Sequence, residues 1–199
     1  MSKAIWKPST LLGPIPPVMV SCGDMNESNI ITIAWCGIVN TNPPMCYISV
    51  RKSRFSYDII KNSGEFAINL TNTELVRAAD WCGVKSGRDV DKFAQMHLEK
   101  EKASQLSCPI IKQSPLSLEC KVKQIIELPS HDMFLSEIVA IDVQPDIIDK
   151  NQKLCLEKAS LVAFSHGEYF SLNDVIGTFG YSVKKNVKAK KKHKFKNKK

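Results

Sequence analysis

The nine residues LECKVKQII, at positions 118–126, decide the fold class of this chain. Apolar and polar side chains alternate along them, and a period of two is typical of a strand with one buried face. A break at Pro129-Ser130 separates this run from residues 133–143, which form a second, mostly apolar run. Two such runs joined by a short break predict an antiparallel β-hairpin.

Outward from this hairpin, the sequence predicts more strands and few helices. Runs rich in apolar and β-branched residues predict strands at 18–22, 29–36, 45–51 and 66–70, with weaker ones at 162–165 and 168–170. The Asn42-Pro43-Pro44 segment forces a turn, because proline has no N–H for a ladder. Since regular alternation of strand and helix is absent, the predicted fold class is mainly β, a closed antiparallel β-barrel with short helices.

Two helices are predicted by their end signals. The first spans 56–62, with Ser56 as its cap and Ser63-Gly64 as its end. The second spans 73–82, with Thr73 as its cap and Gly83 as its end.

Length and composition are those of one ordinary globular domain. The chain has 199 residues, of which 43% are hydrophobic and 24% are charged. It contains no apolar run long enough to cross a bilayer, and it does not begin with a secretory signal pattern. We therefore expect a cytoplasmic protein with no membrane partner.

The net charge of +8 belongs to one end of the chain. Residues 184–199 contain ten lysines and no acidic residue, so residues 1–183 carry a net charge of −2. A lysine run this dense repels itself, which predicts a domain at 1–183 and a disordered lysine-rich tail at 184–199. The tail is either a solubilising extension or a contact for nucleic acid or an acidic partner. The domain itself gives no sign of nucleic-acid binding.

The seven cysteines show no metal-binding or redox spacing. Their number is odd, and no two of them form a C-x-x-C pair. Several lie inside apolar runs, as Cys120 does. We therefore interpret them as packing residues in a reducing compartment.

Two segments carry residues suited to a nucleotide. The first, SVRKSRFSY at 49–57, places cations and hydroxyls between a predicted strand and a predicted helix. Such a turn suits a phosphate, although an ordinary solvated turn has the same composition. The second, NIITIAWCG at 29–37, places Trp35 among small and hydroxyl residues. Trp35 suits the face of a flat heterocycle, although a strand tryptophan is commonly a core residue.

Together these segments resemble the flavin reductase-like family, and within it most of all the flavoredoxin branch. The resemblance covers residues 10–181. It rests on NIITIAW at 29–35, TNPPM at 41–45, YISVR at 47–51, SYDII at 56–60, GEFAINL at 64–70, CGVKSGR at 82–88, DKF at 91–93 and SHDMF at 130–134.

This resemblance implies a split β-barrel of Greek-key type that binds FMN and is a homodimer. The residues implied for the phosphate end of FMN are Ser49, Val50, Arg51, Ser56 and Tyr57. Those implied for the isoalloxazine ring or the ribityl chain are Asn29, Thr32, Ala34, Trp35, Cys36 and Lys92. His131 lies where relatives carry a turn histidine. It is either a nicotinamide-facing residue or simply an exposed one.

The implied function is an FMN-dependent oxidoreductase, because the cofactor supplies the redox chemistry without a catalytic triad or a carboxylate pair. Its electrons come either from NAD(P)H, as in a flavin or ferric reductase, or from a reduced protein donor. The alternative is a non-catalytic flavin-binding module that its basic tail recruits to a partner. The chain has no G-x-G-x-x-G fingerprint for a dinucleotide.

Overall fold

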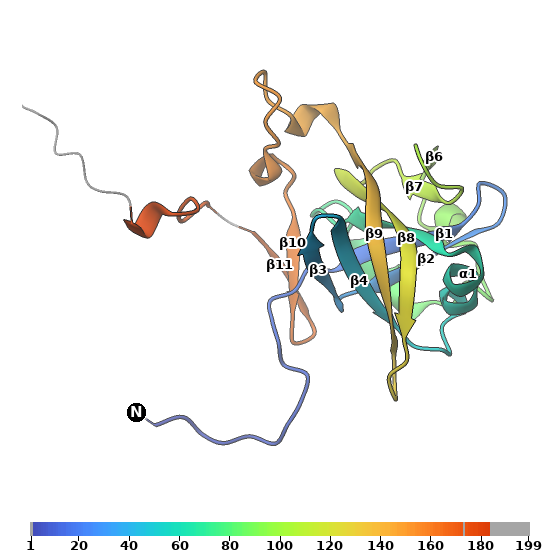
Figure 1. The fold of residues 1–199 in the computed structure, drawn as a ribbon, viewed down its shortest axis with the longest axis horizontal. Helices are drawn as coiled ribbons and strands as arrows, with labels where there is room; N and C mark the ends of the chain where they lie inside the picture. Colours follow the sequence, from blue (N-terminus) through green and yellow to red (C-terminus); the bar gives the residue numbers. More distant parts are fainter. Residues whose placement is uncertain (1, 173, 184–199) are drawn as a thin grey trace, which may run out of the picture.

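The core of the protein is one antiparallel sheet of seven strands. In the computed structural model, which describes residues 2–172 and 174–183, the strand order is β2-β1-β5-β8-β9-β4-β3 (Figure 1). The strands are β1 (Val18–Gly23), β2 (Ser28–Ile33), β3 (Cys36–Thr41), β4 (Pro44–Val50), β5 (Glu65–Leu70), β8 (Leu116–Ile126) and β9 (Asp132–Val143). The predicted hairpin at 118–143 is confirmed, since β8 and β9 pair along their whole length at the centre of this order.

The sheet curls into a barrel that does not close. Its edge strands β2 and β3 follow each other in sequence, but no ladder joins them, so the prediction of a closed barrel is wrong. Near this gap, the amide of Ser49 on β4 donates to the carbonyl of Trp35, in the β2–β3 link. The interior is packed with buried apolar side chains from β1, β2, β4, β5, β8 and β9, among them Phe66 and Phe134, and the partly buried Cys36 of β3 packs against them.

The strand β3 and the end of β2 differ from the sequence prediction. A single strand is predicted over 29–36, whereas β2 ends at Ile33 and Cys36 already begins β3. Most of β3 is exposed and pairs only with β4, so its side chains lack the alternating burial that would mark a strand in the sequence.

The first helix, α1 (Phe55–Ser63), begins without the predicted cap. Ser56 lies buried inside the first turn and accepts a hydrogen bond from Asn29, while Arg54 occupies the cap position without a side-chain capping bond to the helix. The helix ends as predicted at Gly64. This residue has a φ of 71° and donates its amide to Ile60.

The second helix, α2 (Val76–Val84), begins later than predicted and contains Gly83 rather than ending at it. The Asn72 carboxamide accepts the amide of Leu75 before the helix begins. A Cβ at position 83 would lie 3.3 Å from the Thr32 Cβ, so the glycine serves close packing of α2 on β2.

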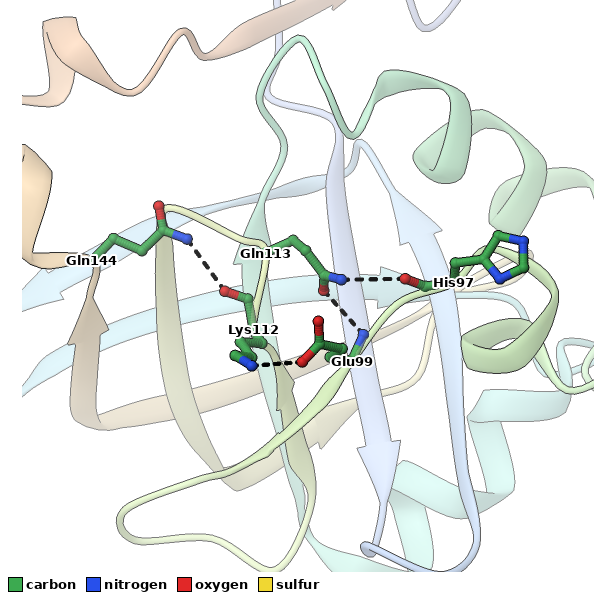
Figure 2. Close-up of polar contacts among 5 residues, drawn as sticks. All are labelled: His97, Glu99, Lys112, Gln113 and Gln144. Atoms are coloured by element: carbon green, nitrogen blue, oxygen red, sulfur yellow. Dashed lines mark hydrogen bonds and ion pairs between the residues drawn. The ribbon is translucent and has the colours of Figure 1, made fainter.

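The chain between α2 and β8 forms an excursion that the sequence did not predict. It contains α3 (Lys92–Gln95) and the small antiparallel pair β6 (Lys100–Lys102) and β7 (Pro109–Ile111). Figure 2 shows how side chains fasten it. Gln113 accepts the amide of Glu99 and donates to the carbonyl of His97, and Gln144 donates to the carbonyl of Lys112.

The C-terminal region forms the predicted strand pair, β10 (Val162–Ser165) and β11 (Glu168–Ser171). The short 3-10 helices η1 (Pro145–Ile147) and η2 (Leu156–Lys158) precede it, and η3 (Tyr181–Val183) follows it. Figure 1 shows the N-terminal arm leaving the barrel beside this hairpin, where Ile15 pairs with Phe164.

The predicted tail at 184–199 lies outside the described residues. Six of the seven cysteines are buried and Cys36 is partly buried, which confirms their interpretation as packing residues. Within the described residues, no helix combines the length and the apolarity needed to cross a membrane. The cytoplasmic location stays a prediction.

Glu119 on β8 and Asp142 on β9 are two interacting acidic residues. Both oxygens of the buried Glu119 accept backbone amides, from Ser104 and Gln105. No N–H or O–H group of the described residues donates to the buried Oδ2 of Asp142. Burial, and then a hydrogen bond shared with Glu119, raises the pKa of Asp142 from 3.8 to about 6.

We expect Asp142→Asn to stabilise the protein above pH 6. Because the folded-state pKa lies above the ordinary 3.8, ionisation of Asp142 destabilises the fold as the pH rises from 3.8 through about 6. An amide avoids this ionisation, so the variant should melt about 2 °C above wild type at pH 7.5, with the difference gone at pH 4. Melting of the exposed Asp146→Asn control should match wild type at both pH values, and a pH-independent effect of Asp142→Asn would contradict the raised pKa of Asp142.

Candidate functional site

A continuous cleft lies where β2 and β4 end, beside α1 and the loop that follows α2. It consists of two adjoining pockets of about 170 and 230 Å³, which share Ile31, Arg51 and Arg54. We call the first the tryptophan end, lined by Ile31, Thr32, Ile33, Ala34, Trp35, Ser49, Val50, Arg51, Arg54 and His131. We call the second the arginine end, lined by Asn29, Ile31, Arg51, Ser53, Arg54, Phe55, Ser56, Cys82, Lys85, Ser86, Gly87, Arg88 and Lys92.

The arginine end collects positive charge without any counter-charge. Its lining includes the cations Arg51, Arg54, Lys85, Arg88 and Lys92 but no aspartate or glutamate. None of these five residues makes an ion pair with any of the described residues. Their uncompensated charge, together with serine hydroxyls, suits an anion such as a phosphate.

The two arginines nearest α1 are held in place by backbone carbonyls. Arg88 donates from Nη1 to the carbonyl of Ser53 at 3.1 Å, and its guanidinium lies 5.6 Å from the centre of the Phe55 ring. Arg54 donates from Nη1 to the carbonyl of Gly83 at 3.5 Å. These contacts use only part of each guanidinium, so donors remain for a ligand.

Lys92 is the buried cation of this end. Its side chain is only 4% exposed, and its ammonium donates to the carbonyls of Ile30 and Cys82, each at 2.7 Å. Burial lowers the pKa of Lys92 from its usual value, although the neighbouring thiols of Cys82 and Cys22 counteract this. A third ammonium hydrogen stays available at the wall of the pocket.

The floor of the arginine end is built by a close approach of two segments. Asn29 donates from Nδ2 to the hydroxyl of Ser56 at 2.7 Å. A Cβ at position 87 would lie 2.2 Å from Asn29 Oδ1 and 2.7 Å from the Phe55 ring, so only glycine fits there.

The tryptophan end is flatter and more apolar. Trp35 is 41% exposed, so it does not belong to the core, and its ring centre lies 4.5 Å from that of His131. Arg51 donates from Nε to Nε2 of His131 at 3.2 Å, which leaves the proton on Nδ1 to be donated to the hydroxyl of Ser130 at 2.9 Å. Burial, Arg51 and Arg54 together lower the pKa of His131, which favours the neutral ring.

The structure brings most of the sequence-predicted site residues into this cleft. Asn29, Ser56 and Lys92 line the arginine end, and Arg51 lines both ends. At the tryptophan end lie Thr32, Ala34, Trp35, Ser49, Val50 and His131.

Tyr57 and Cys36 line neither end of the cleft. Tyr57 is buried in the barrel core, where its hydroxyl donates to Oδ2 of Asp132 at 2.6 Å. Cys36 begins β3, and its thiol lies 4.0 Å from the carbonyl of Pro16.

Other lining residues are missing from the sequence-based assignment, chiefly Lys85, Gly87 and Arg88. They belong to the segment at 82–88, which contributes to the family resemblance but supplies none of the predicted site residues. Its mixture of two glycines, a serine and two cations was the one signal that could have identified a phosphate-binding loop.

Comparison with known proteins identifies the family of this chain and solved structures that share its fold. The family model for a flavin reductase like domain matches residues 13–172. Among solved structures, flavoredoxin of Desulfovibrio vulgaris (Miyazaki F) is 28% identical, with a TM-score of 0.85 over 92% of this chain and 100% of its own. Flavoredoxin from Methanosarcina acetivorans is 26% identical, with a TM-score of 0.82 over the same shares. These matches confirm the predicted split-barrel fold.

Two curated relatives carry the same named activity, that of FMN reductase (NADH) RutF. The FMN reductase (NADH) RutF of Pseudomonas syringae pv. syringae is 24% identical over 119 residues. This match covers 60% of this chain and 64% of the relative, so the chain spans less than two thirds of that protein.

We expect Arg51→Gln to raise the pKa of His131. Burial and the cations Arg51 and Arg54 hold this pKa below its ordinary value, so removal of one cation lets the ring protonate at a higher pH. An NMR titration of the imidazole signal, assigned by its loss in His131→Asn, measures the change. Lys52→Gln, at the next position, is the control and should leave the midpoint in place. An unchanged midpoint in Arg51→Gln would show that the contact with Arg51 does not set the pKa.

Proposed function

This chain belongs to the flavin reductase-like family, and from that premise we propose that it binds FMN in the cleft and works as an oxidoreductase. The proposal rests on the order in which charged and then apolar lining residues follow each other along the cleft. One end holds five cations without a carboxylate, and the adjoining end holds an exposed indole and backbone of two strand ends. A phosphate joined to a flat ring matches this order.

The residues present fit FMN rather than only a generic anion. Arg54, Arg88 and Lys92 would hold the phosphate, because each lines the arginine end with a hydrogen-bond donor to spare. Ala34 and Trp35 would border the ring. FMN, when bound, accepts a hydride or passes on one or two electrons. The chain's own residues bind it, orient it and limit the access of water.

The electron donor is the open part of the proposal. The relative RutF is named for NADH, and the two flavoredoxins are not named for a nicotinamide. The ring of His131, which contacts Trp35 at a tilt of 43° and lines the tryptophan end, is positioned to contact a donor there. Both NAD(P)H and a reduced protein remain candidate donors.

A second copy of this chain is the partner we propose. The edge strand β3 supports this proposal, because its residues Ile38 and Val39 are 67% and 50% exposed. An exposed apolar edge strand is a ready surface for pairing between chains.

We expect the arginine end to distinguish FMN from riboflavin, which lacks the phosphate. Arg54→Ala and Arg88→Ala should each weaken FMN binding about tenfold and leave riboflavin binding unchanged, because each removes a charge-assisted contact. Quenching of flavin fluorescence on titration measures both affinities, with Arg77→Ala on the exposed face of α2 as the control. Equal losses for both flavins would contradict the phosphate assignment, and a wild-type chain that takes up no flavin would overturn the proposed function.

We expect the FMN-loaded protein to lose its yellow colour under anaerobic conditions when a donor of the right class is added. Bleaching by NADH or NADPH identifies a nicotinamide-dependent reductase. Bleaching only by a reduced ferredoxin-like protein identifies an electron carrier. If neither donor bleaches the flavin while dithionite does, the oxidoreductase proposal fails and the chain is a flavin-binding module.

A further inference from the structure

A third pocket adjoins the cleft and plays no part in the function proposed above. It has a volume of about 500 Å³ and lies between the N-terminal arm and the turn of the β10–β11 hairpin. We call it the arm pocket, lined by Ser9, Thr10, Leu11, Leu12, Gly13, Ile15, Ala34, Trp35, Phe164, Ser165, His166 and Gly167. Because Ala34 and Trp35 also line the tryptophan end, these two residues form a wall shared by both sites.

The pocket is held open by specific contacts between the arm and the hairpin. Ile15 and Phe164 exchange two backbone hydrogen bonds, of 3.0 and 2.8 Å. A Cβ at Gly13 would lie only 3.0 Å from the hydroxyl of Ser165, so the arm passes close to the hairpin. The hairpin is in turn fixed to α2, where Tyr169 donates to Asp80 at 3.2 Å.

The turn between β10 and β11, which forms one wall of the pocket, is a tight turn of two residues. His166 and Gly167 have φ angles of 51° and 91°, and their neighbours Ser165 and Glu168 pair across the hairpin. A two-residue hairpin turn with positive φ at both positions matches the twist of the strands. The imidazole of His166 is therefore presented on a defined backbone.

Apart from His166, the described residues that line the arm pocket have uncharged side chains. None of these described residues is a lysine, arginine, aspartate or glutamate, whereas five cations line the arginine end. Its aromatic surfaces are Trp35 and Phe164, and its polar groups are the hydroxyls of Ser9, Thr10 and Ser165. A charged ligand would lose its hydration there without gaining a partner, and a flat apolar one would not.

We propose that the arm pocket binds a small, uncharged aromatic compound that carries a hydroxyl or carbonyl group. The aromatic walls contact its ring, and the hydroxyls or His166 hydrogen-bond its oxygen. Because Trp35 is shared, a ligand in this pocket and a flavin in the cleft should change each other's affinity by the same factor. This coupling rests on the proposed function, whereas the ligand site itself does not.

The test uses 2-naphthol as the probe and 2-naphthoate as its charged counterpart with the same rings. Calorimetric titration of the full chain, with and without saturating FMN, should show one saturable site for 2-naphthol. Binding of 2-naphthoate to the FMN-saturated protein should be at least about tenfold weaker, because the pocket offers its carboxylate no cation. Equal affinities, or no saturable binding of 2-naphthol, would overturn the proposal.

Three variants locate the site. Phe164→Ala should weaken 2-naphthol binding about tenfold, and Phe164→Leu, which keeps the apolar bulk, should weaken it less. Phe170→Ala is the matched control, because Phe170 lies on the same hairpin, is exposed and does not line the pocket. Unchanged binding in both Phe164 variants would place the ligand elsewhere and refute the site.

The same titrations separate this proposal from the proposed function. If the protein takes up no FMN but still binds 2-naphthol in a Phe164-dependent way, the function fails and the arm pocket stands. If FMN binds but its affinity is the same with and without 2-naphthol, the coupling through Trp35 is wrong.

Discussion

The ammonium of Lys92 is the interaction on which the cleft depends. It joins the carbonyl of Ile30 in β2 to the carbonyl of Cys82 in α2, from a side chain that is almost fully buried. In this way it fixes α2 and the loop 85–91 over the end of β2. Burying a cation among neutral carbonyls is costly, since carbonyl dipoles replace only part of the lost hydration. A nearby anion would offset that cost, so the positive charge of the arginine end suits a bound anion.

Two other cations of the arginine end, nearer the surface, also donate hydrogen bonds to backbone carbonyls. Arg54 and Arg88 are oriented by backbone carbonyls, so their positive charge is positioned without being neutralised. By contrast, Lys52 lies just outside the cleft and reaches the carboxylates of Glu127 and Asp132. Neighbouring cations on one turn thus have different partners. The charge of Lys52 is therefore paired with carboxylates, whereas the charges of Arg54 and Arg88 are not paired within the described part of the chain.

The sequence predicted the strands well wherever one face is buried. The hairpin at 118–143 shows this most clearly, because burial on one side imposes a period of two. The sequence failed where burial gives no periodic signal, as in β3, whose residues are mostly exposed. The roles of Ser56 and Gly83 were also misjudged as cap and stop. Both are set by contacts with β2, and local sequence carries no record of such tertiary neighbours.

The candidate site was found in outline because cations, hydroxyls and a tryptophan occur in short segments of the sequence. The loop 85–88 was missed because its approach to Asn29 and Phe55 exists only in three dimensions. Trp35 lies where the cleft and the arm pocket meet. It stands in the link between the edge strands β2 and β3, which no ladder joins. Because Trp35 lines both the cleft and the arm pocket, one side chain can report the occupancy of both.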